Sequence, residues 1–548
     1  MSAAQTIGWL FDGQHGPSDR LIPRWLFLRV FGLIYFSAFF STVFQIRGLI
    51  GPDGILPAGP YLHQVSQSLG HGERLWYAPT LVWFSSGPHM LLGICWAGML
   101  ASVLLVLNIW PRGVLVVCFV CFLSLIAAAQ DFSSYQSDGM LLEAGFISLF
   151  FASPGFFPGL ARLHPAPRAS LFLLQWEWFR IYFESGAVKL LSGDPEWRNF
   201  TAMDDYYQNG PLPTWIGWYV QQSPHWFHAF TVGATLVMEL GLIWMMFLPR
   251  RWRIALFFIV TIWQAVVIST ANYAFLNYLV LVMGVLLLDD RFLLRVTPNR
   301  WKRVMAEKTN VSLIAAQQPE PDDSEDSEQR ETTPTLSWKQ RFSHHWGALR
   351  LATVSIVLSW IFYVTATEMI WMFWRVPLPS LPVAVLEPFR VANQYGLFAV
   401  MTRGRYEIEF QGSQDGQNWT AYPFRYKPQA LNEPPRIYAP YQPRFDWNLW
   451  FASLSMWRES PIVPNTEVRL LSNDKDVLSL FAGNPFSREA PRQIRAVLWQ
   501  YWFTSLAEKR ATGNWWRRQY LGLYAPTLER ESDGGIKVIQ WPDVAPRQ

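Results

Sequence analysis

Four ionisable side chains lie within one apolar stretch, LLQWEWFRIYFESGAVKLLSGDPEW, at residues 173–197. Glu177, Arg180 and Glu184 fall within about 60° of one another on a helix, so they share a face and can form a carboxylate–guanidinium–carboxylate network. Pairing is expected because an isolated charge in an apolar medium carries a large desolvation penalty. The network is either a polar functional site inside a membrane bundle or an ion cluster that fixes helix packing, and the sequence leaves both open.

Lys189 lies about 120° around the same predicted helix from Glu177, near the end of the stretch. A lysine at that level either extends its charged head to the membrane surface or, if it is kept from water, can act as a base near neutral pH. Gly186 and Ala187, just before it, would allow a neighbouring helix to approach closely.

Further polar residues are expected at the same level, next to the ends of other helices. They either roof a cavity that opens outward or form a solvated loop rim. The set comprises Asp131, Asp138, Glu143, Asp194, Trp197, Asn272 and Asn277. His225 and His228 have a spacing found in metal sites, but no third ligand stands at helical spacing, so we predict no metal.

The composition is typical of a membrane protein. Hydrophobic residues make up 51% of the 548 residues, and the 30 tryptophans suit the two lipid–water interfaces. A formal charge of +4 gives no reason to expect nucleic acid as a partner. The sequence has no phosphate-binding P-loop, no dinucleotide-binding glycine motif and no G-x-S-x-G motif. The three cysteines lie in apolar runs, so CFVC at 118–121 is predicted to pack rather than to bind metal.

Apolar segments predict a polytopic α-helical membrane protein with about nine transmembrane helices, because about twenty apolar residues span a bilayer. We expect them at 24–46, 89–109, 113–130, 139–154, 169–190, 226–247, 253–270, 272–288 and 350–372. Basic residues concentrate in alternate loops, which predicts a cytoplasmic N-terminus and a C-terminus outside. The expected domains are an eight-helix membrane domain (1–305), an acidic disordered cytoplasmic linker (306–345), a ninth transmembrane helix (346–376) and a C-terminal extracytoplasmic domain (377–548).

The C-terminal domain is predicted to be α+β. Alternating residues flank Asp415 and Gly416 in RYEIEFQGSQDGQNWTAYPFRYKP, which favours a β-hairpin. PRFDWNLWFASL has helical spacing, and PRQIRAVLWQYWFTSLAEKRATG (491–513) is likewise expected to be helical, with Gly513 just beyond its end. The aromatic residues expected to contact a client are Trp447, Trp515 and Trp516.

Several segments, in this order along the chain, resemble the lipase maturation factor family: IRGLIGPDGILPA, RIYFESGAVKLLSGDPEWRNFTAM, ANYAFLNYL, YEIEFQGSQDGQNWTAYPFRYKP, YQPRFDW and TGNWWRR. The resemblance covers nearly the whole chain. It implies a polytopic membrane protein that helps lipases to fold and assemble, with a C-terminal domain that faces the lumen in relatives of the endoplasmic reticulum. The absence of cysteine from the outward-facing parts suggests instead a bacterial inner-membrane protein that faces the periplasm.

A shorter segment, YFESGAVKL, is similar to the YFxAGxxKL pattern of vitamin K-dependent γ-carboxylases and their horizontally transferred transmembrane-domain (HTTM) relatives. That resemblance implies an HTTM-like bundle in which Lys189 is a base toward a quinol, framed by Tyr182, Phe183 and Gly186. Glu184 replaces an apolar residue of that pattern, and the third and fourth predicted helices contain no histidine that could serve as a partner.

Two functions of different classes follow. The first is a non-enzymatic, membrane-embedded folding and maturation factor for exported lipases or other secreted clients, without a cofactor. The second is a membrane enzyme that acts on a lipid or quinone with Lys189 as its base. The expected partners are membrane lipids and exported lipase-like clients.

Overall fold

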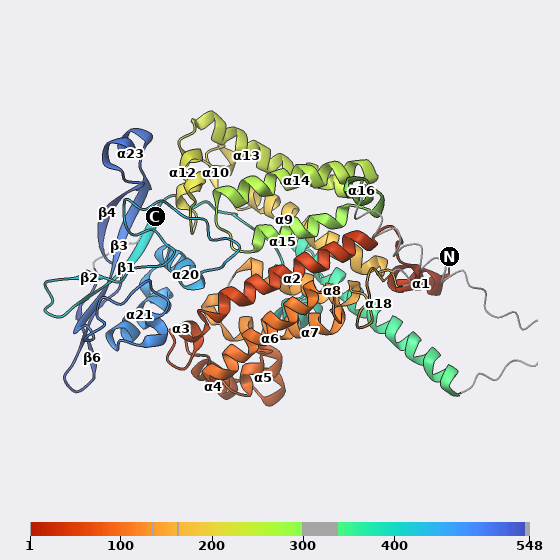
Figure 1. Cartoon of the computed structure of the whole chain (residues 1–548), viewed down its shortest axis with the longest axis horizontal. Coiled ribbons are helices and arrows are strands. Elements are labelled where there is room, and N and C mark those ends of the chain that lie inside the picture. The colour runs from red at the N-terminus through yellow and green to blue at the C-terminus, as the bar shows by residue number, and fades with distance from the viewer. Residues whose placement is uncertain (1, 134, 162–163, 299–337, 543–548) are drawn as a thin grey trace, which may run out of the picture.

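The computed structural model describes residues 2–133, 135–161, 164–298 and 338–542. A bundle of helices carries an antiparallel sheet domain at one end (Figure 1). Most of the predicted acidic linker, 306–337, lies outside the described residues. Its predicted last part, 338–345, is instead the start of helix α18 (Trp338–Phe373), which therefore begins before the predicted ninth span.

Within the described ranges, six helices are long and apolar enough to cross a membrane. They are α2 (Leu21–Val43), α6 (Pro88–Val106), α7 (Pro111–Ala128), α13 (His225–Leu240) with its 3₁₀ continuation η4 (Leu242–Phe247), α14 (Arg250–Thr270) and α18. The chain is therefore a helical membrane protein with six candidate spans.

The other three predicted spans are helices that are too short or too polar to count among the six. α8 (Gln136–Phe151) has 16 residues, and α15 (Leu276–Gly284) has 9 before the 3₁₀ turn η5 (Val285–Leu287). Both fall short of the roughly twenty residues that a span needs. α9 (Arg168–Leu191) has 24 residues but contains the four ionisable groups of the opening stretch. Length and polarity thus reduce the predicted nine spans to six candidates.

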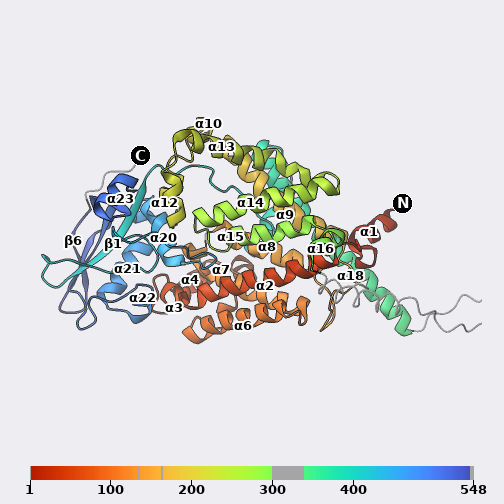
Figure 2. The same ribbon diagram turned by 45° about the horizontal axis from the view of Figure 1, so that its top comes forward.

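Short helices complete the membrane half. They are α1 (Ala3–Phe11), α3 (Ile46–Ile50), α4 (Ala58–Ser68), α5 (His71–Tyr77), α10 (Pro195–Arg198), α11 (Tyr206–Asn209), α12 (Trp215–Gln221) and α16 (Asp290–Val296), with 3₁₀ turns η1 (Gly13–His15), η2 (Leu81–Trp83) and η3 (Gln130–Ser133). α1 and the start of α18 lie at the end of the bundle opposite the sheet (Figures 1 and 2). α18 therefore carries the chain from that end toward the C-terminal domain.

The C-terminal domain is α+β, and its strands pair antiparallel. The strands are β1 (Arg405–Ser413), β2 (Thr420–Ala421), β3 (Gln493–Phe503), β4 (Trp516–Leu523), β5 (Thr527–Arg530) and β6 (Ile536–Gln540), in the order β2-β1-β3-β5-β6 with β4 also on β3. The helices are α19 (Leu381–Leu386), α20 (Arg444–Ser453), α21 (Ile462–Leu471), α22 (Lys475–Leu478) and α23 (Leu506–Thr512), with 3₁₀ turns η6 (Glu387–Phe389) and η7 (Trp457–Glu459).

The sequence prediction for this domain is confirmed in two places and wrong in one. β1 and β2 form the predicted hairpin, and α20 is the predicted helix. The segment 491–513 is not one helix, because its first part is strand β3, paired along its length with β1 and β4, and only its last part forms α23. Gly513 has φ +77° and ends α23, as a C-terminal glycine should.

The two halves share one hydrophobic core. Buried side chains of the bundle, such as Phe27 and Leu141, belong to the same continuous cluster as Phe445 and Ile494 of the C-terminal domain. Residues from distant parts of the chain therefore meet at the junction between the two halves.

Candidate functional site

An extended segment, residues 390–402, links the last membrane helices to β1, and we call it the connecting segment. It contains no helix or strand, so its main-chain N–H and C=O groups need partners elsewhere in the protein. It lies alongside α9, and the polar residues that the sequence singled out bind it there.

Arg180 and Glu143 lie at the centre of this arrangement. They form a buried ion pair between α9 and α8, and Arg180 also donates to the carbonyl oxygen of Asn393 at 2.6 Å. Glu143 in turn accepts the main-chain N–H of Asn393 at 2.9 Å and the hydroxyl of Tyr395 at 2.8 Å. The pair therefore holds two residues of the connecting segment against the bundle.

The predicted network of Glu177, Arg180 and Glu184 forms only in part. Glu184 lies 3.8 Å from Arg180 and accepts the main-chain N–H of Tyr395 at 2.7 Å. Glu177 is buried and accepts a long hydrogen bond, 3.4 Å, from the Tyr395 hydroxyl, while its Oε2 has no hydrogen-bond partner among the described residues. Glu143, from another helix, is thus the closest carboxylate partner of Arg180.

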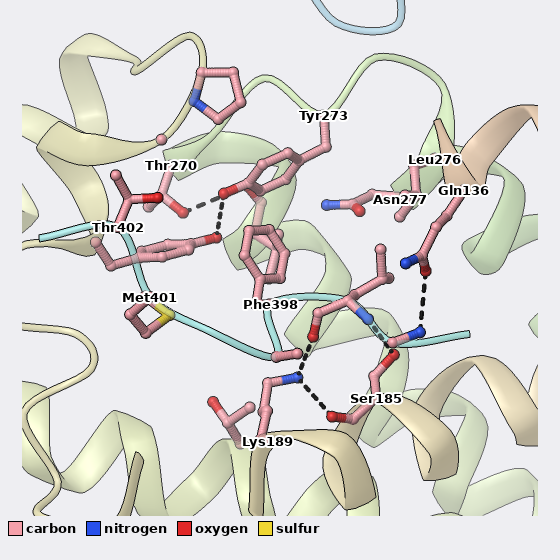
Figure 3. Close-up of a pocket in the computed structure, with 18 of the residues that line it drawn as sticks. Gln136, Ser185, Lys189, Thr270, Tyr273, Leu276, Asn277, Phe398, Met401 and Thr402 are labelled. Carbon is pink, nitrogen blue, oxygen red and sulfur yellow. Dashed lines mark hydrogen bonds between the residues drawn. The ribbon is translucent and has the colours of Figure 1, made fainter. Parts of the chain in front are cut away.

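Lys189 is buried rather than extended to a membrane surface, with 2% of the residue exposed. Its Nζ lies 2.8 Å from a carboxylate oxygen of Glu239 on α13. It also donates to the carbonyl oxygens of Leu397 at 3.0 Å and of Ser185 at 3.3 Å, the latter seen in Figure 3. The ring of Trp197 lies 5.1 Å from the same nitrogen. The side chain of Lys189 therefore does not extend freely to an interface, as snorkelling would require.

The chain after α9, which includes α10 and α11, binds the rest of the connecting segment. Asp194 accepts the N–H of Met401 at 2.7 Å, and Trp197 donates to the carbonyl oxygen of Phe398 at 3.0 Å. Asn209 donates to the carbonyl oxygen of Thr402 at 2.8 Å. Main-chain groups from Asn393 to Thr402 thus find their partners on α8, on α9 and in the chain that follows it.

Three other predicted rim residues have different surroundings. Asp138 is fully buried and forms a bidentate pair with Arg444 of α20, with both N–O distances 2.7 Å. Asn272 binds the C-terminal domain through the carbonyl oxygen of Arg436 at 2.8 Å and the N–H of Tyr438 at 2.7 Å. Asp131 is exposed to solvent.

A cavity of about 540 Å³ lies beside Lys189, at the junction of the two halves. Lys189, Trp197, Asn277 and Trp447 of the predicted residues line it, together with Glu239. Figure 3 shows Lys189 on one side of the connecting segment and Asn277 on the other. Part of the predicted rim thus lines this cavity, and its role as a roof stays a prediction.

Two of the three tryptophans predicted to contact a client are buried. Trp447 is 7% exposed on the cavity wall, and Trp516 is 1% exposed and packs 4.6 Å from the ring of Phe503. Trp515 is half-buried and lies under the ammonium group of Lys509, 4.0 Å from the ring centre. Of the three, only Trp515 can contact another protein without rearrangement.

The two histidines are not brought together at a metal site. His225 lies 2.9 Å from Asp204, whereas His228 is buried against Tyr207. No group of three or more metal-binding side chains occurs in the part of the chain that the structure describes. The cysteines at 95, 118 and 121 are buried and unbonded to one another.

Sequence reasoning missed Glu239, Asn393, Tyr395 and Arg444. Glu239 carried a usable signal, since it is a single carboxylate within the apolar run TLVMELGLIW. Asn393 and Tyr395 lie more than 200 residues from the α9 side chains they bind, in a segment with no periodic pattern. No local signal could have paired them.

Comparison with known proteins covers both halves of the chain. The family model for the lipase maturation factor transmembrane domain matches residues 22–295, and that for the lipase maturation factor C-terminal domain matches residues 391–526. Lipase maturation factor 2 of Gallus gallus is 32% identical over 92% of this chain and 81% of its own length. Lipase maturation factor 1 of Bos taurus is 30% identical over 95% of this chain and 91% of its own length. No solved structure matches the chain. The chain belongs to the lipase maturation factor family.

Proposed function

We propose that the chain is a membrane-embedded maturation factor that assists exported lipases or other secreted clients to fold. The observation that carries this proposal is the match to lipase maturation factors across both the membrane half and the C-terminal domain, over more than four fifths of the length of the relatives. A maturation factor that only binds its client needs a protein-binding surface and no catalytic residues. The polar residues of α9 agree with such a role, because the connecting segment occupies them.

The C-terminal domain is proposed to lie on the outer side of the membrane, where an exported client emerges. α1 and the start of α18 stand at the opposite end of the bundle, and the basic residues Arg250, Arg251 and Arg253 begin α14. Basic residues favour the cytoplasmic side. The absence of cysteine from the C-terminal domain supports a bacterial inner membrane with this domain in the periplasm.

Trp515 is the proposed client contact, because it is the half-exposed member of the predicted aromatic set. Its neighbour Lys509 adds a positive charge over the ring, a pairing that also occurs at recognition surfaces. Trp515→Ala should lower the yield of active client while leaving the factor folded. Trp541→Ala, at another exposed tryptophan of the same domain, is the matched control and should have no effect.

A catalytic role for Lys189 is the second candidate, favoured by the position of Lys189 and Glu239 on the wall of the cavity. A base must be neutral and direct its lone pair at the substrate. Here the lysine nitrogen faces a carboxylate and two carbonyl oxygens, those of Ser185 and Leu397, which favours a structural ion pair.

One complementation experiment separates the two candidates. The gene is deleted in its native host and replaced by the wild type, by Lys189→Met or by Lys189→Met/Glu239→Leu, with membrane levels of each checked. Specific activity and antigen level of exported lipases are then measured. We expect deletion to lower lipase activity while antigen persists, and the double variant to restore more activity than the single one. A double variant that folds but stays inactive would support the base, and no lipase effect on deletion would refute the maturation role.

A further inference from the structure

The cavity at the junction of the two halves has walls from both. α9, α13, α14 and α15 contribute on the side of the bundle, and the connecting segment and α20 contribute on the other side. Its volume of about 540 Å³ is within the range that holds one small ligand. The lining combines apolar and aromatic side chains with a few polar ones, which is the usual character of such sites.

The charges on the cavity wall cancel. Lys189 and Glu239 are the two charged residues that line it, and they are bound to each other at 2.8 Å. An anionic headgroup would have to compete with Glu239 for the lysine, and a cationic one with Lys189 for the carboxylate. The cavity therefore favours a ligand without net charge.

Five buried polar atoms in residues that border the cavity have no hydrogen-bond partner within the described ranges. Three are donors, on Asn277 Nδ2, Trp447 Nε1 and Trp450 Nε1, and two are acceptors, on Gln264 Oε1 and Asn209 Oδ1. All five residues are at most 9% exposed. Buried polar atoms nearly always have a hydrogen-bond partner, so five without one in residues around a single cavity require an explanation. A ligand with both acceptors and donors would supply the missing partners once these side chains turn toward the cavity.

The cavity is lined by two helices that are largely uncovered by the rest of the protein, α13 and α14. Both are candidate membrane spans with little of their apolar windows buried, 28% and 22% respectively. α13 lines the cavity with Thr231 and Thr235, and α14 lines it with Val266 and Val267. Val266 is 54% exposed, so the α14 wall of the cavity reaches the surface of the bundle.

We propose that this cavity binds an uncharged glycerolipid of the mono- or diacylglycerol class, which enters between α13 and α14. Its ester carbonyl oxygens accept from Asn277 and the α20 tryptophans, and its free hydroxyl donates to Gln264 or Asn209. The first part of one acyl chain lies against the apolar lining, and the remaining hydrocarbon extends into the bilayer because the cavity is too small for the whole lipid. A quinone offers acceptors only and would leave both unpartnered acceptors unsatisfied, and a phospholipid brings a charge that the Lys189–Glu239 pair does not accommodate. This proposal is independent of the client role.

Photolabelling of the purified full-length protein tests the proposal. The protein is placed in phosphatidylcholine nanodiscs with a diacylglycerol probe that carries a diazirine in one acyl chain, and labelled peptides are identified by mass spectrometry. We expect labels to concentrate in residues 225–240 and 250–270 and in the connecting segment. Unlabelled diacylglycerol should compete, whereas phosphatidylglycerol and ubiquinone should not. Label spread evenly over the lipid-facing helices, or equal competition by the other lipids, would overturn the proposal.

Two variants of α14 provide a matched comparison. Val267→Trp adds a bulky ring to the cavity wall and should lower labelling by about tenfold, because the ring overlaps the ligand volume. Ile262→Trp places the same residue type on the same helix at a position that is 67% exposed and does not line the cavity. It should label like the wild type. Equal labelling of the two variants would exclude the cavity as the site.

Asn277→Leu replaces an amide whose nitrogen has no partner among the described residues by an apolar group of similar size, so the variant should fold. Labelling should fall by about fivefold, as expected from the loss of one hydrogen bond to the ligand. The melting temperature of the lipid-free protein should not fall, because the amide nitrogen makes no hydrogen bond within the described part of the protein. Unchanged labelling in this variant would remove Asn277 from the site and contradict the headgroup placement.

Discussion

Lys189 shows how a charged side chain in an apolar helix is held by a second side chain and by the main chain at once. The salt bridge to Glu239 joins α9 to α13, and the hydrogen bond to Leu397 joins α9 to the connecting segment. Loss of one partner from a buried pair leaves an uncompensated charge, whereas loss of both leaves none. The energetic roles of Lys189 and Glu239 are therefore coupled.

Removal of either member of this pair should be more harmful than removal of both. Lys189→Met and Glu239→Leu should each lower the free energy of unfolding by about 3–5 kcal/mol, and the double variant should lose less than either single variant. Denaturant unfolding in detergent, read by tryptophan fluorescence, measures the cycle. Lys475→Met, at an exposed lysine, is the control and should change stability little. Additive losses in the cycle would contradict the coupling.

Asp446 gives the C-terminal domain a pH dependence of predictable sign. Burial raises the pKa of this carboxyl group from 3.8 to about 6, although it accepts the main-chain N–H groups of Lys427 and Tyr426. Between these pH values the folded state keeps a proton that the unfolded chain has released. The free energy of unfolding therefore falls as the pH rises through this window.

Asp446→Asn should remove this fall, because the amide does not titrate. The wild type should lose about 3 kcal/mol relative to the variant as the pH rises from about 3 to about 7. Denaturant unfolding at several pH values measures the difference. Asp415 is a control of opposite sign, because hydrogen bonds from the main-chain N–H groups of Asn418 and Gln417 lower its pKa, so its contribution is lost as the pH falls. Equal pH profiles for the wild type and Asp446→Asn would refute the assignment.

At the level of elements, the polar groups of α8 and α9 act as partners for an extended stretch of chain. Non-helical backbone that is packed against apolar helices needs hydrogen bonds from the protein itself. Asn393 is central to this, since its amide donates to the carbonyl oxygen of Gly139 at 3.1 Å and to Glu143 at 3.1 Å. The connecting segment should therefore be as protected as a regular strand.

Asn393→Ala should open the connecting segment locally. Hydrogen exchange of peptides within 390–402 should become about tenfold faster, because one or two buried hydrogen bonds are lost. Mass spectrometry of exchange in detergent measures this, and β1 and β3 should keep their protection. Gln394→Ala, at the exposed neighbouring residue, is the matched control. Faster exchange in both variants, or in neither, would contradict the role of Asn393.

The helices could be predicted from the sequence because a run of apolar residues is visible in the local sequence alone. The charged face of α9 was also visible, since Arg180 and Glu184 lie one turn apart. Their main partners could not be predicted, because Asn393 and Tyr395 are distant in sequence and bind through main-chain groups. The segment that forms β3 was predicted to be a helix because the spacing of its aromatic residues fits both the helical and the strand period. Pairing with β1 and β4 decides its structure.

At the scale of the whole molecule, the bundle and the C-terminal domain should unfold as one unit. They share a hydrophobic core and are joined by the buried pair of Asp138 and Arg444. Arg444 also donates to the carbonyl oxygen of Phe132 at 2.7 Å. Such a bidentate pair is strong and geometrically specific, so it fixes α20 on the N-terminal end of α8.

Arg444→Met should uncouple the two halves, because it leaves Asp138 buried without its partner. The wild type is expected to melt in a single transition and the variant in two, with the C-terminal domain melting first. Scanning calorimetry together with tryptophan fluorescence distinguishes these cases. Arg469→Met is the matched control, since Arg469 also bridges the halves but does so at the surface, 3.8 Å from Asp53. An exposed pair is worth at most about 1 kcal/mol, so this control should keep the single transition. One transition in Arg444→Met, at an unchanged temperature, would mean that the shared core alone couples the C-terminal domain to the membrane bundle.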